Sequence, residues 1–362
     1  MMNTPDISTA YRARDRMCRG VHIANLLEVR LPALNLIRRP HVLTPIALDD
    51  LTWTGRDLRR PECVLATASG YVYCSDGRGG VMQIGADGAQ QLYTAAPEGA
   101  AALRPNGIAL RRNGNFLMAN IADEGGVFEL SRSGTLKELV SRVDGIDLPP
   151  TNFVCEDRLG RVWITVSTWR MPRSRAYRRE VADGFITCLD ANGARIVADG
   201  IGYANEVALS PDGLFLYVNE TFGRRLTRFR IRDDNTLAGR ETVCTFGKGT
   251  YPDGLTFDAE GGAWVTSIIS NRVIRVLPDG SQHVILEDAD PAHIEWCEEA
   301  YENGTMARGH LEKAAGRVLK NISSLAFGGR DLRTIYLGCL LGDALATFSS
   351  PVAGAEPAHW SY

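Results

Sequence analysis

Six oxygen-bearing side chains recur at one phase of an internal repeat in this sequence of 362 residues. They are Glu62, Asn106, Asn152, Asn205, Asp253 and Ser323. Hard oxygen ligands match a divalent cation such as calcium, and the carboxylates of Glu62 and Asp253 would balance its charge. Without a cation, two carboxylates buried at the end of a channel would repel each other, and one would tend to take up a proton. If the fold brings these side chains together, the set predicts a cation site.

A plainer interpretation of the same residues is that Asn and Asp before a strand form turns by hydrogen-bonding to their own backbone. This alternative is strongest for Asn106, which is followed by Gly107, and Ser323 is also a weak member of the set. Five residues in one phase, with an acid at the first and the fifth, favour a shared function over five separate turns.

The elements that must position these residues follow from the repeat. Each of the first five opens a nine-residue segment that ends in glycine, and the five starts are 44, 46, 53 and 48 residues apart. Apolar residues stand two and mostly four places after each start, which is typical of a strand, and the glycine closes a hairpin. Such a period has room for four strands, the content of one propeller blade. A sixth unit begins at Ser323, so we predict an all-β fold, a six-bladed β-propeller.

The remaining length predicts the domain organisation. Residues 1–55 precede the first unit, and part of them is expected to complete the last blade and close the ring. The propeller is predicted to span residues 56–350 and to be followed by a C-terminal tail, residues 351–362. Apolar residues recur at helical spacing near the end of the 287–320 segment, which predicts a short helical insertion between blades five and six. They are Leu311, Ala314, Ala315, Val318 and Leu319.

Composition narrows the class of partner. The sequence has 40 Lys and Arg against 43 Asp and Glu, a formal charge of −3, without a run of one sign. This balance gives no electrostatic reason for a nucleic-acid or membrane partner, so we expect a small-molecule substrate. No apolar stretch approaches the length of a membrane span and the first residues lack a signal-peptide core, so a cytoplasmic protein is predicted. The eight cysteines are scattered, which indicates buried free thiols.

Two stretches resemble a known family. Residues 205–218 and 251–264 are similar to the senescence marker protein, gluconolactonase and luciferin-regenerating enzyme family, the regucalcin-like six-bladed propeller lactonases, and the resemblance covers roughly residues 60–350. It implies a metal-dependent hydrolase that opens a lactone or related ester. It also implies one divalent cation on the channel axis, calcium first, with manganese, zinc or magnesium as alternatives. By motif, its ligands are Glu62, Asn152, Asn205 and Asp253, and Asp253 is the catalytic base or nucleophile.

The chain departs from the sugar lactonases of that family around the first ligand asparagine. Those members tend to carry an Arg two positions before it and an Asp directly after it, where this chain has Pro150 and Phe153. Several aromatic residues flank the phased positions, which predicts a substrate more apolar than a simple sugar lactone, although core packing is the commoner role for each of them taken singly. They are Phe153, Trp169, Tyr203, Phe222 and Tyr251. The side chains expected to contact the substrate are Asn106, Phe153, Trp169 and Ser323.

Three functions from different classes stay open. The first is the lactonase or esterase just described. The second follows from Pro61-Glu62-Cys63 and residues 217–221, which lean toward the strictosidine-synthase-like branch of the superfamily and toward condensation or lyase chemistry. The third is a binding propeller whose cation is structural. A homo-oligomer is compatible with all three.

Overall fold

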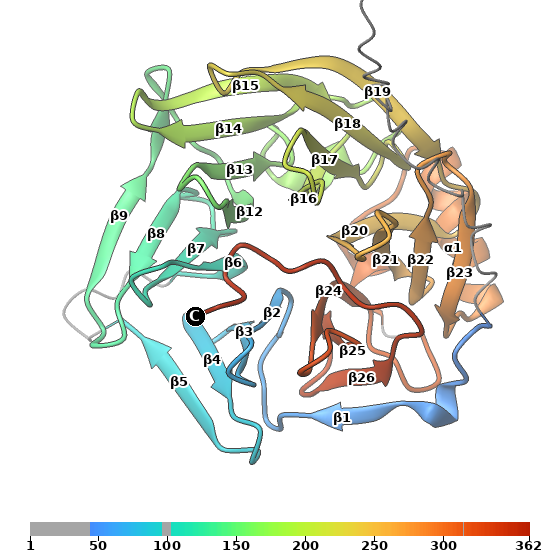
Figure 1. The fold of residues 1–362 in the computed structure, drawn as a ribbon. Coiled ribbons are helices and arrows are strands. Elements are labelled where there is room, and N and C mark those ends of the chain that lie inside the picture. Colours follow the sequence, from blue (N-terminus) through green and yellow to red (C-terminus); the bar gives the residue numbers. More distant parts are fainter. Residues whose placement is uncertain (1–43, 96–102, 314) are drawn as a thin grey trace, which may run out of the picture. The chain divides into compact units, whose positions relative to one another are not determined.

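The computed structural model describes residues 44–95, 103–313 and 315–362, which form six four-stranded antiparallel sheets around a central channel (Figure 1). This confirms the predicted six-bladed β-propeller. The first three blades are β2 (Val64–Ala66), β3 (Val72–Asp76), β4 (Gly80–Ile84) and β5 (Gln90–Thr94); β6 (Pro105–Leu110), β7 (Phe116–Asn120), β8 (Val127–Leu130) and β9 (Leu136–Val140); and β12 (Thr151–Glu156), β13 (Val162–Val166), β14 (Gly184–Asp190) and β15 (Gly193–Ile201).

The other three blades repeat this order from the channel outwards. They are β16 (Ala204–Leu209), β17 (Phe215–Glu220), β18 (Arg225–Ile231) and β19 (Leu237–Thr245); β20 (Thr250–Phe257), β21 (Ala263–Ile269), β22 (Arg272–Val276) and β23 (Gln282–Glu287); and β24 (Ile322–Gly328), β25 (Thr334–Cys339), β26 (Leu345–Ser349) and β1 (Thr52–Thr54). A small hairpin of β10 (Arg142–Val143) and β11 (Ile146–Asp147) and the 3-10 turns η1 (Leu48–Asp50) and η3 (Arg173–Ala176) lie outside these sheets.

The sixth blade joins two distant parts of the chain. Strand β1 pairs antiparallel with β26, with Thr52 opposite Thr347 and Thr54 opposite Leu345. Residues 52–54 therefore supply the outermost strand of a sheet whose other three strands come from residues 322–349. Residues 1–43, the rest of the segment expected to help close the ring, lie outside the described residues.

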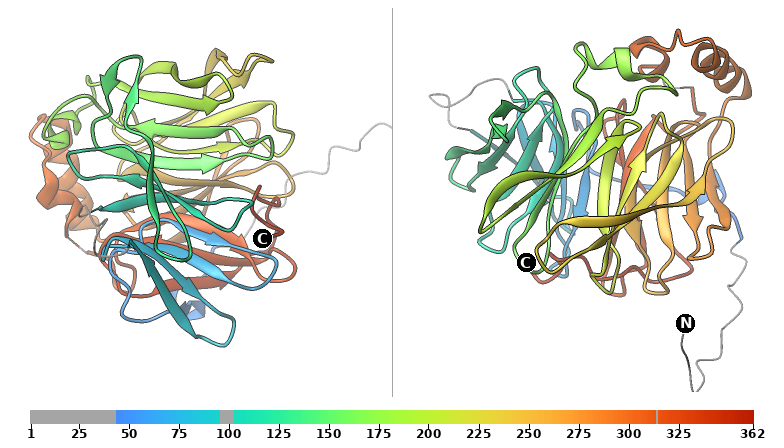
Figure 2. Two further views of the ribbon diagram at one scale, coloured as in Figure 1. Left: turned by 90° about the vertical axis from the view of Figure 1, so that its left-hand side faces the viewer. Right: turned by 90° about the horizontal axis from the view of Figure 1, so that it is seen from above.

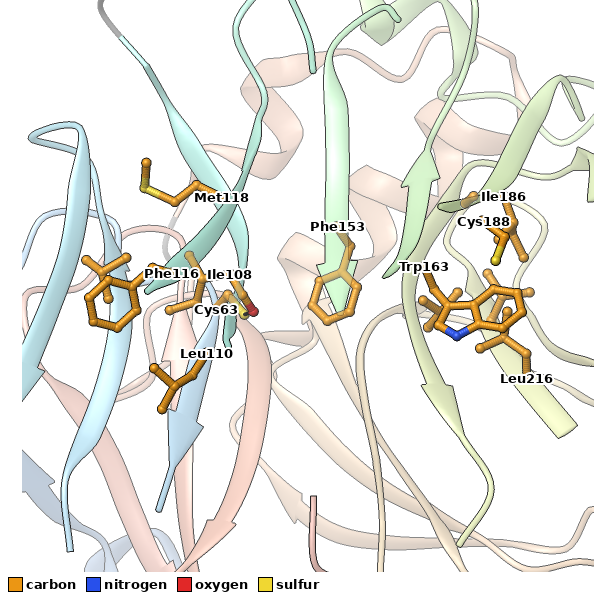
Figure 3. Packing of buried hydrophobic residues seen from close by; sticks show 14 of the residues in the cluster. Cys63, Ile108, Leu110, Phe116, Met118, Phe153, Trp163, Ile186, Cys188 and Leu216 are labelled. Atoms are coloured by element: carbon orange, nitrogen blue, oxygen red, sulfur yellow. Dashed lines mark hydrogen bonds between the residues drawn. The ribbon is translucent and has the colours of Figure 1, made fainter. Parts of the chain in front are cut away.

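The core lies between neighbouring blades. One buried cluster extends over the first four blades, and Figure 3 shows Phe116 and Ile108 near Cys63 on one side and Phe153 and Trp163 on the other. Two buried tryptophans occupy equivalent places in blades three and five. The indole N–H of Trp163 donates to Asp157 (2.9 Å), and that of Trp264 donates to Asp258 (2.8 Å). The same tryptophan–aspartate hydrogen bond recurs because both blades carry an aspartate in the turn after their innermost strand.

The helical insertion is present, but its helices lie earlier than the apolar spacing predicted. The structure has α1 (Pro291–Glu302) and the short α2 (Arg308–Leu311), whereas the described residues beyond Leu311 are not helical up to β24. The carboxylate of Asp288 accepts the backbone N–H groups of Arg317, Val318 and Leu319 at 2.9, 2.8 and 2.7 Å, which holds this stretch as a loop. Helix α1 instead starts where Asp290 caps it and Pro291 fits its first turn.

The two ends of the channel carry different segments. Helix α1 and η3 lie over one face of the ring, and the C-terminal residues lie over the other (Figure 2). The C-terminal segment, residues 351–362, crosses the ring from blade five to blade one. The N–H of Ala355 donates to Phe257 O (2.9 Å), and the N–H of Ala68 donates to Trp360 O (2.8 Å).

Two further sequence features can be placed. Seven of the eight cysteines fall in the described residues, and all seven are free thiols. Across the described ranges, no helix is both long and apolar enough to span a bilayer.

Candidate functional site

All six phased side chains are buried, and five of them stand next to a β-bulge. The register slips next to the phased residue in five of the six innermost strands, namely β6, β12, β16, β20 and β24. A bulge adds a residue to one strand and re-aims a side chain that the regular alternation would send elsewhere. We call the six residues Glu62, Asn106, Asn152, Asn205, Asp253 and Ser323 the oxygen ring.

Four members of the oxygen ring are joined by hydrogen bonds. The side-chain amide of Asn106 donates to Glu62 Oε1 (2.7 Å) and to the backbone oxygen of Asn152 (3.0 Å). Its nitrogen also lies 3.3 Å from Asn152 Oδ1. Ser323 Oγ donates to the backbone oxygen of Glu62 (2.9 Å). Asn106 and Ser323 thus hold Glu62 from two sides.

A repeated hydrogen-bond relay orients the two other asparagines. Asn152 Nδ2 donates to Ser167 Oγ (2.9 Å), which donates to the backbone oxygen of Ala204 in the next blade (2.9 Å). In the following blade Asn205 Nδ2 donates to Thr221 Oγ1 (3.0 Å), which donates to the backbone oxygen of Pro252 (2.8 Å). Each of these amide nitrogens donates within its own blade. The amide oxygen of Asn205 has no partner among the described residues, whereas that of Asn152 is approached by Asn106 Nδ2.

The oxygens that remain are unsatisfied. Glu62 Oε2, Asn205 Oδ1 and Asp253 Oδ1 are buried and have no hydrogen-bond partner among the described residues. Buried acceptors are normally paired, so three unpaired ones in one ring need an explanation. Burial, opposed by the charges of Arg60 and Arg173, raises the pKa of Glu62. Burial and the nearby charge of Glu62 raise the pKa of Asp253 well above its usual range.

The donor set fits a hard cation. Carboxylate and amide oxygens are the ligands that calcium takes, and a cation here would satisfy the unpaired acceptors and offset both charges. Within the described ranges no three His, Cys, Asp or Glu side chains gather into a metal site. Glu62 and Asp253 provide only two carboxylates, so a cation at the ring would also need amide oxygens such as those of Asn152 and Asn205.

Two arginines lie beside the oxygen ring. Arg60 Nη2 donates to Asn106 Oδ1 (2.8 Å). Arg173, in η3, donates from Nε to Tyr203 Oη (2.8 Å), and its Nη1 is buried without a hydrogen-bond partner among the described residues. The charges of both arginines act on both Glu62 and Asp253.

The aromatic residues expected to line the substrate pocket divide into three groups. Tyr203, Phe222 and Tyr251 pack in series, with ring centroids 4.8 and 5.9 Å apart, in a buried cluster that includes residues of the insertion. Trp169 is 37% exposed and stacks on Phe185 at 4.4 Å. Phe153 lines a cavity beyond the oxygen ring.

The helical insertion is tied to the strand that carries Asp253. Glu298 of α1 forms an ion pair with Arg224 and accepts hydrogen bonds from Gly249 N–H (2.9 Å) and Tyr251 Oη (3.0 Å). Tyr251 precedes Asp253 by two residues in β20. The insertion is therefore bound to the start of β20, the strand that carries Asp253.

A cavity of about 540 Å³ occupies the channel on the other side of the oxygen ring. Its lining begins with residues that directly follow the ring members, among them Cys63, Glu206 and Ser324, and includes residues 355–359 of the C-terminal segment. Glu206 Oε2 accepts the N–H of Leu255 (2.8 Å), and burial raises the pKa of Glu206 well above its usual range.

Sequence reasoning missed several of these residues. Arg60 stands two places before Glu62, so its charge next to a predicted ligand was a usable signal. Glu206 also gave a signal, because a carboxylate follows Asn205 at the place where glycine follows the ring members Asn106 and Asp253. Arg173, Ser167 and Thr221 gave no such signal, because their roles depend on contacts between different elements.

This chain is similar to proteins of known families. The profile described as the SMP-30/Gluconolactonase/LRE-like region matches residues 60–291. A 6-deoxy-6-sulfogluconolactonase from Pseudomonas putida is 29% identical over 234 residues, which cover 64% of this chain and 67% of the relative. A strictosidine synthase-like protein 4 from Arabidopsis thaliana is 24% identical over 171 residues, which cover 46% of this chain and 44% of the relative.

Solved structures share the fold. Regucalcin from Agrobacterium tumefaciens, described as a calcium-binding protein, superimposes with a TM-score of 0.60 at 19% identity. The match covers 83% of this chain and 95% of that one.

Proposed function

Since the chain belongs to the SMP-30/gluconolactonase/LRE-like family, we propose that it is a hydrolase that opens a lactone or related ester with one divalent cation on the channel axis. One observation supports this most. Three buried oxygens of the ring, on Glu62, Asn205 and Asp253, have no partner among the described residues. Membership of the family supports lactonase chemistry, and the relative from Pseudomonas putida is itself named as a lactonase.

The residues proposed to hold the cation are Glu62, Asn152, Asn205 and Asp253. Calcium is the first candidate because all four donors are hard oxygens, and a structural neighbour is described as calcium-binding; manganese, zinc and magnesium are the alternatives. When bound, such a cation supplies Lewis-acid polarisation of the ester carbonyl.

The chain's own residues have separate roles in this proposal. Asp253 orients the attacking water and takes its proton. Because a bound cation lowers the pKa of a carboxylate ligand, orienting the water is the larger part of this role. Asn106 positions Glu62 through its 2.7 Å hydrogen bond. The burial of the ring excludes bulk water, which strengthens each electrostatic interaction there.

The expected preference for an apolar substrate stays a prediction. Three of the five aromatic residues on which it was based pack in the core, so Trp169 and Phe153 are the remaining candidates for apolar contact. A cytoplasmic location and a homo-oligomer also stay predictions.

A second candidate function is non-hydrolytic chemistry, a condensation or an elimination. The similarity to the strictosidine synthase-like protein favours it. It differs from hydrolysis in one observable way, since it releases no acid from a lactone.

The test combines metal analysis with a substrate screen. The purified chain is analysed for metals, stripped with a chelator and screened with a pH indicator against aliphatic, aromatic and sugar lactones. We expect one cation per chain, acid release that stops on chelation, and recovery with calcium. Full activity in metal-free protein would refute metal dependence, and absence of acid release from every lactone would favour the second candidate.

Site variants make the same test residue by residue. Asp253→Asn keeps the shape but removes the charge and the base, so kcat should fall by about 10²- to 10⁴-fold at saturating calcium. Asn205→Ala removes one neutral ligand, so added calcium should restore much of the rate. Ser210→Ala, in the turn between β16 and β17 of the same blade as Asn205, is the matched control. A near-parental kcat in Asp253→Asn would place the chemistry elsewhere.

A further inference from the structure

The hydrogen bonds of the two arginines beside the oxygen ring go to neutral groups and not to its carboxylates. Arg60 hydrogen-bonds to the amide of Asn106 and Arg173 to the phenol of Tyr203, both neutral groups. Among the described residues, neither guanidinium forms an ion pair with Glu62 or Asp253, although their charges interact. Both guanidinium groups therefore keep the capacity to bind an anion.

The charges at the site favour an anion once a cation is present. The ring contributes two negative charges, from Glu62 and Asp253, and the arginines contribute two positive ones. Among these four groups, a divalent cation at the ring, as in the proposed function, leaves an excess of two positive charges next to buried carboxylates. Unbalanced buried charge is costly, so a bound anion would lower the free energy of the loaded site.

Arg173 is built to receive that anion. Its Nη1 is a buried donor without a partner among the described residues. Its guanidinium is fixed by the hydrogen bond to Tyr203 and lies 5.5 Å from the centre of the Tyr203 ring. Tyr203 itself is held edge-on against Phe222 and Tyr177, with centroids 4.8 and 5.4 Å apart. A planar guanidinium fixed in this way suits the oxygens of a carboxylate or sulfonate.

Arg60 is held close to the ring by an unusual backbone. Its φ of 50° lies in the left-handed region that non-glycine residues seldom adopt, and such strain collects at functional sites. The N–H of Glu62 donates to the backbone oxygen of Arg60 (2.7 Å), which couples this turn to the ring. The turn therefore places a positive charge within reach of a substrate whose carbonyl lies at the ring.

We propose that the substrate is an anionic lactone, which carries a carboxylate or sulfonate group bound by Arg173 and Arg60 beside the oxygen ring. The inference rests on the proposed hydrolase function and adds the class of substrate. Binding of the charged group would fix the ester relative to Asp253, so part of the binding energy would serve orientation.

The first test compares two lactones that differ only in charge. We would measure kcat/KM of the calcium-loaded protein for γ-butyrolactone-γ-carboxylate and for the corresponding carboxamide. The parent should favour the carboxylate by roughly 10- to 100-fold, the usual effect of a hydrogen-bonded charge. In Arg173→Gln and Arg60→Gln this ratio should fall toward one. Arg175→Gln is the matched control, because Arg175 lies in the same turn, η3, but is exposed.

The second test does not depend on turnover. Tetrahydrofuran-2-carboxylate cannot be hydrolysed, so its binding to the calcium-loaded protein can be measured by calorimetry beside that of its amide. We expect the carboxylate to bind more tightly in the parent and in Arg175→Gln, and the difference to disappear in Arg173→Gln.

The two tests separate this inference from the function on which it rests. Hydrolysis of both lactones at equal kcat/KM in the parent would overturn the anionic substrate and leave the hydrolase standing. Arg173-dependent binding of the carboxylate without hydrolysis of any lactone would support the anion site and overturn the hydrolase. Equal binding of the carboxylate by the parent and Arg173→Gln, with thermal stabilisation by inorganic phosphate alone, would show a site for free anions and overturn the inference.

Discussion

At the scale of single residues, the oxygen ring combines asparagine amide nitrogens that are hydrogen-bonded with oxygens that have no hydrogen-bond partner among the described residues. Ser167 and Thr221 engage the amide N–H groups of Asn152 and Asn205 through equivalent relays in successive blades. Glu62 and Asp253 have no comparable set of donors, and each keeps one buried oxygen without a partner among the described residues. The ring is therefore organised for a ligand and is electrostatically costly without one.

This arrangement predicts opposite effects of pH on the free and the calcium-loaded protein. Burial raises the pKa of Glu62 from 4.5 and of Asp253 from 3.8, so above these values the folded state retains protons that the unfolded state has lost. Stability from these groups is fully present below their unfolded pKa values and is lost as pH rises through the folded ones. Calcium binds the deprotonated form, so the stabilisation it gives should increase with pH.

The measurement is thermal unfolding between pH 5 and 8, with chelator and with calcium. At 100 times its dissociation constant calcium should add about 2.7 kcal/mol. The Glu62→Gln/Asp253→Asn double variant is the control, and it should lose both the calcium effect and this part of the pH dependence. A calcium stabilisation of the parent that does not change with pH would contradict the prediction.

The phase of the ring could be read from the sequence because each of its first five residues stands eight places before the glycine of its own turn. Family membership is likewise confirmed. The arginines were missed for a physical reason. Arg173 meets the ring from an irregular segment between β13 and β14, and no periodic pattern predicts where such a segment folds back. Contacts between blades depend on the three-dimensional fold.

At the scale of elements, the C-terminal segment was expected only as a tail, but it lines one end of the channel cavity. His359 lies among its lining residues, and burial lowers the pKa of His359 from 6.5 to about 4. The docked segment therefore excludes a proton that the detached segment would bind between these two values. Docking is fully favoured above pH 6.5 and weakens as pH falls toward 4.

We predict that acid releases this segment before the propeller unfolds. Amide hydrogen exchange of residues 355–362, corrected for the intrinsic rate, should show protection at pH 7 that declines toward pH 4.5. In His359→Phe, which cannot titrate, protection should be independent of pH over the same range. Equal pH dependence in both proteins would assign the effect to another group.

The helical insertion shows what spacing can and cannot predict. Its existence followed from the extra length between blades five and six, but the apolar residues near Val318 were assigned to a helix that lies elsewhere. Asp288 accounts for the difference, because three backbone N–H groups bound to one carboxylate cannot also form a helical ladder. The helical spacing of apolar residues in this short segment was therefore outweighed by the buried carboxylate of Asp288, which holds the backbone as a loop.

At the scale of the whole molecule, five blades are built from continuous stretches of chain, and the sixth joins residues 52–54 to residues 345–347. The hydroxyls of Thr52 and Thr347 lie 2.5 Å apart across this junction. The last blade is therefore completed by a three-residue pairing that, among the described strands, joins the residues farthest apart in the sequence.

We predict that the backbone of β1 matters more than its side chains. Consecutive N–H groups of a strand point to opposite sides, so the Trp53→Pro/Thr54→Pro variant must remove one that faces β26. It should lose about 1–3 kcal/mol of unfolding free energy, the usual cost of an unpaired buried group, in urea titrations. Trp53→Ala/Thr54→Ala keeps the backbone donors and should lose less, since Trp53 is 49% exposed. Equal losses would show that side chains hold the junction.

The same junction orders events during synthesis. On the ribosome, blades one to five can each form once their own residues have emerged, whereas β1 must wait until β26 has been translated. For almost the whole of translation, β1 is an unpaired edge strand, the kind of segment that other chains can capture. A nascent chain stalled before residue 345 should therefore be a substrate for chaperones, and release of the last residues should end that dependence.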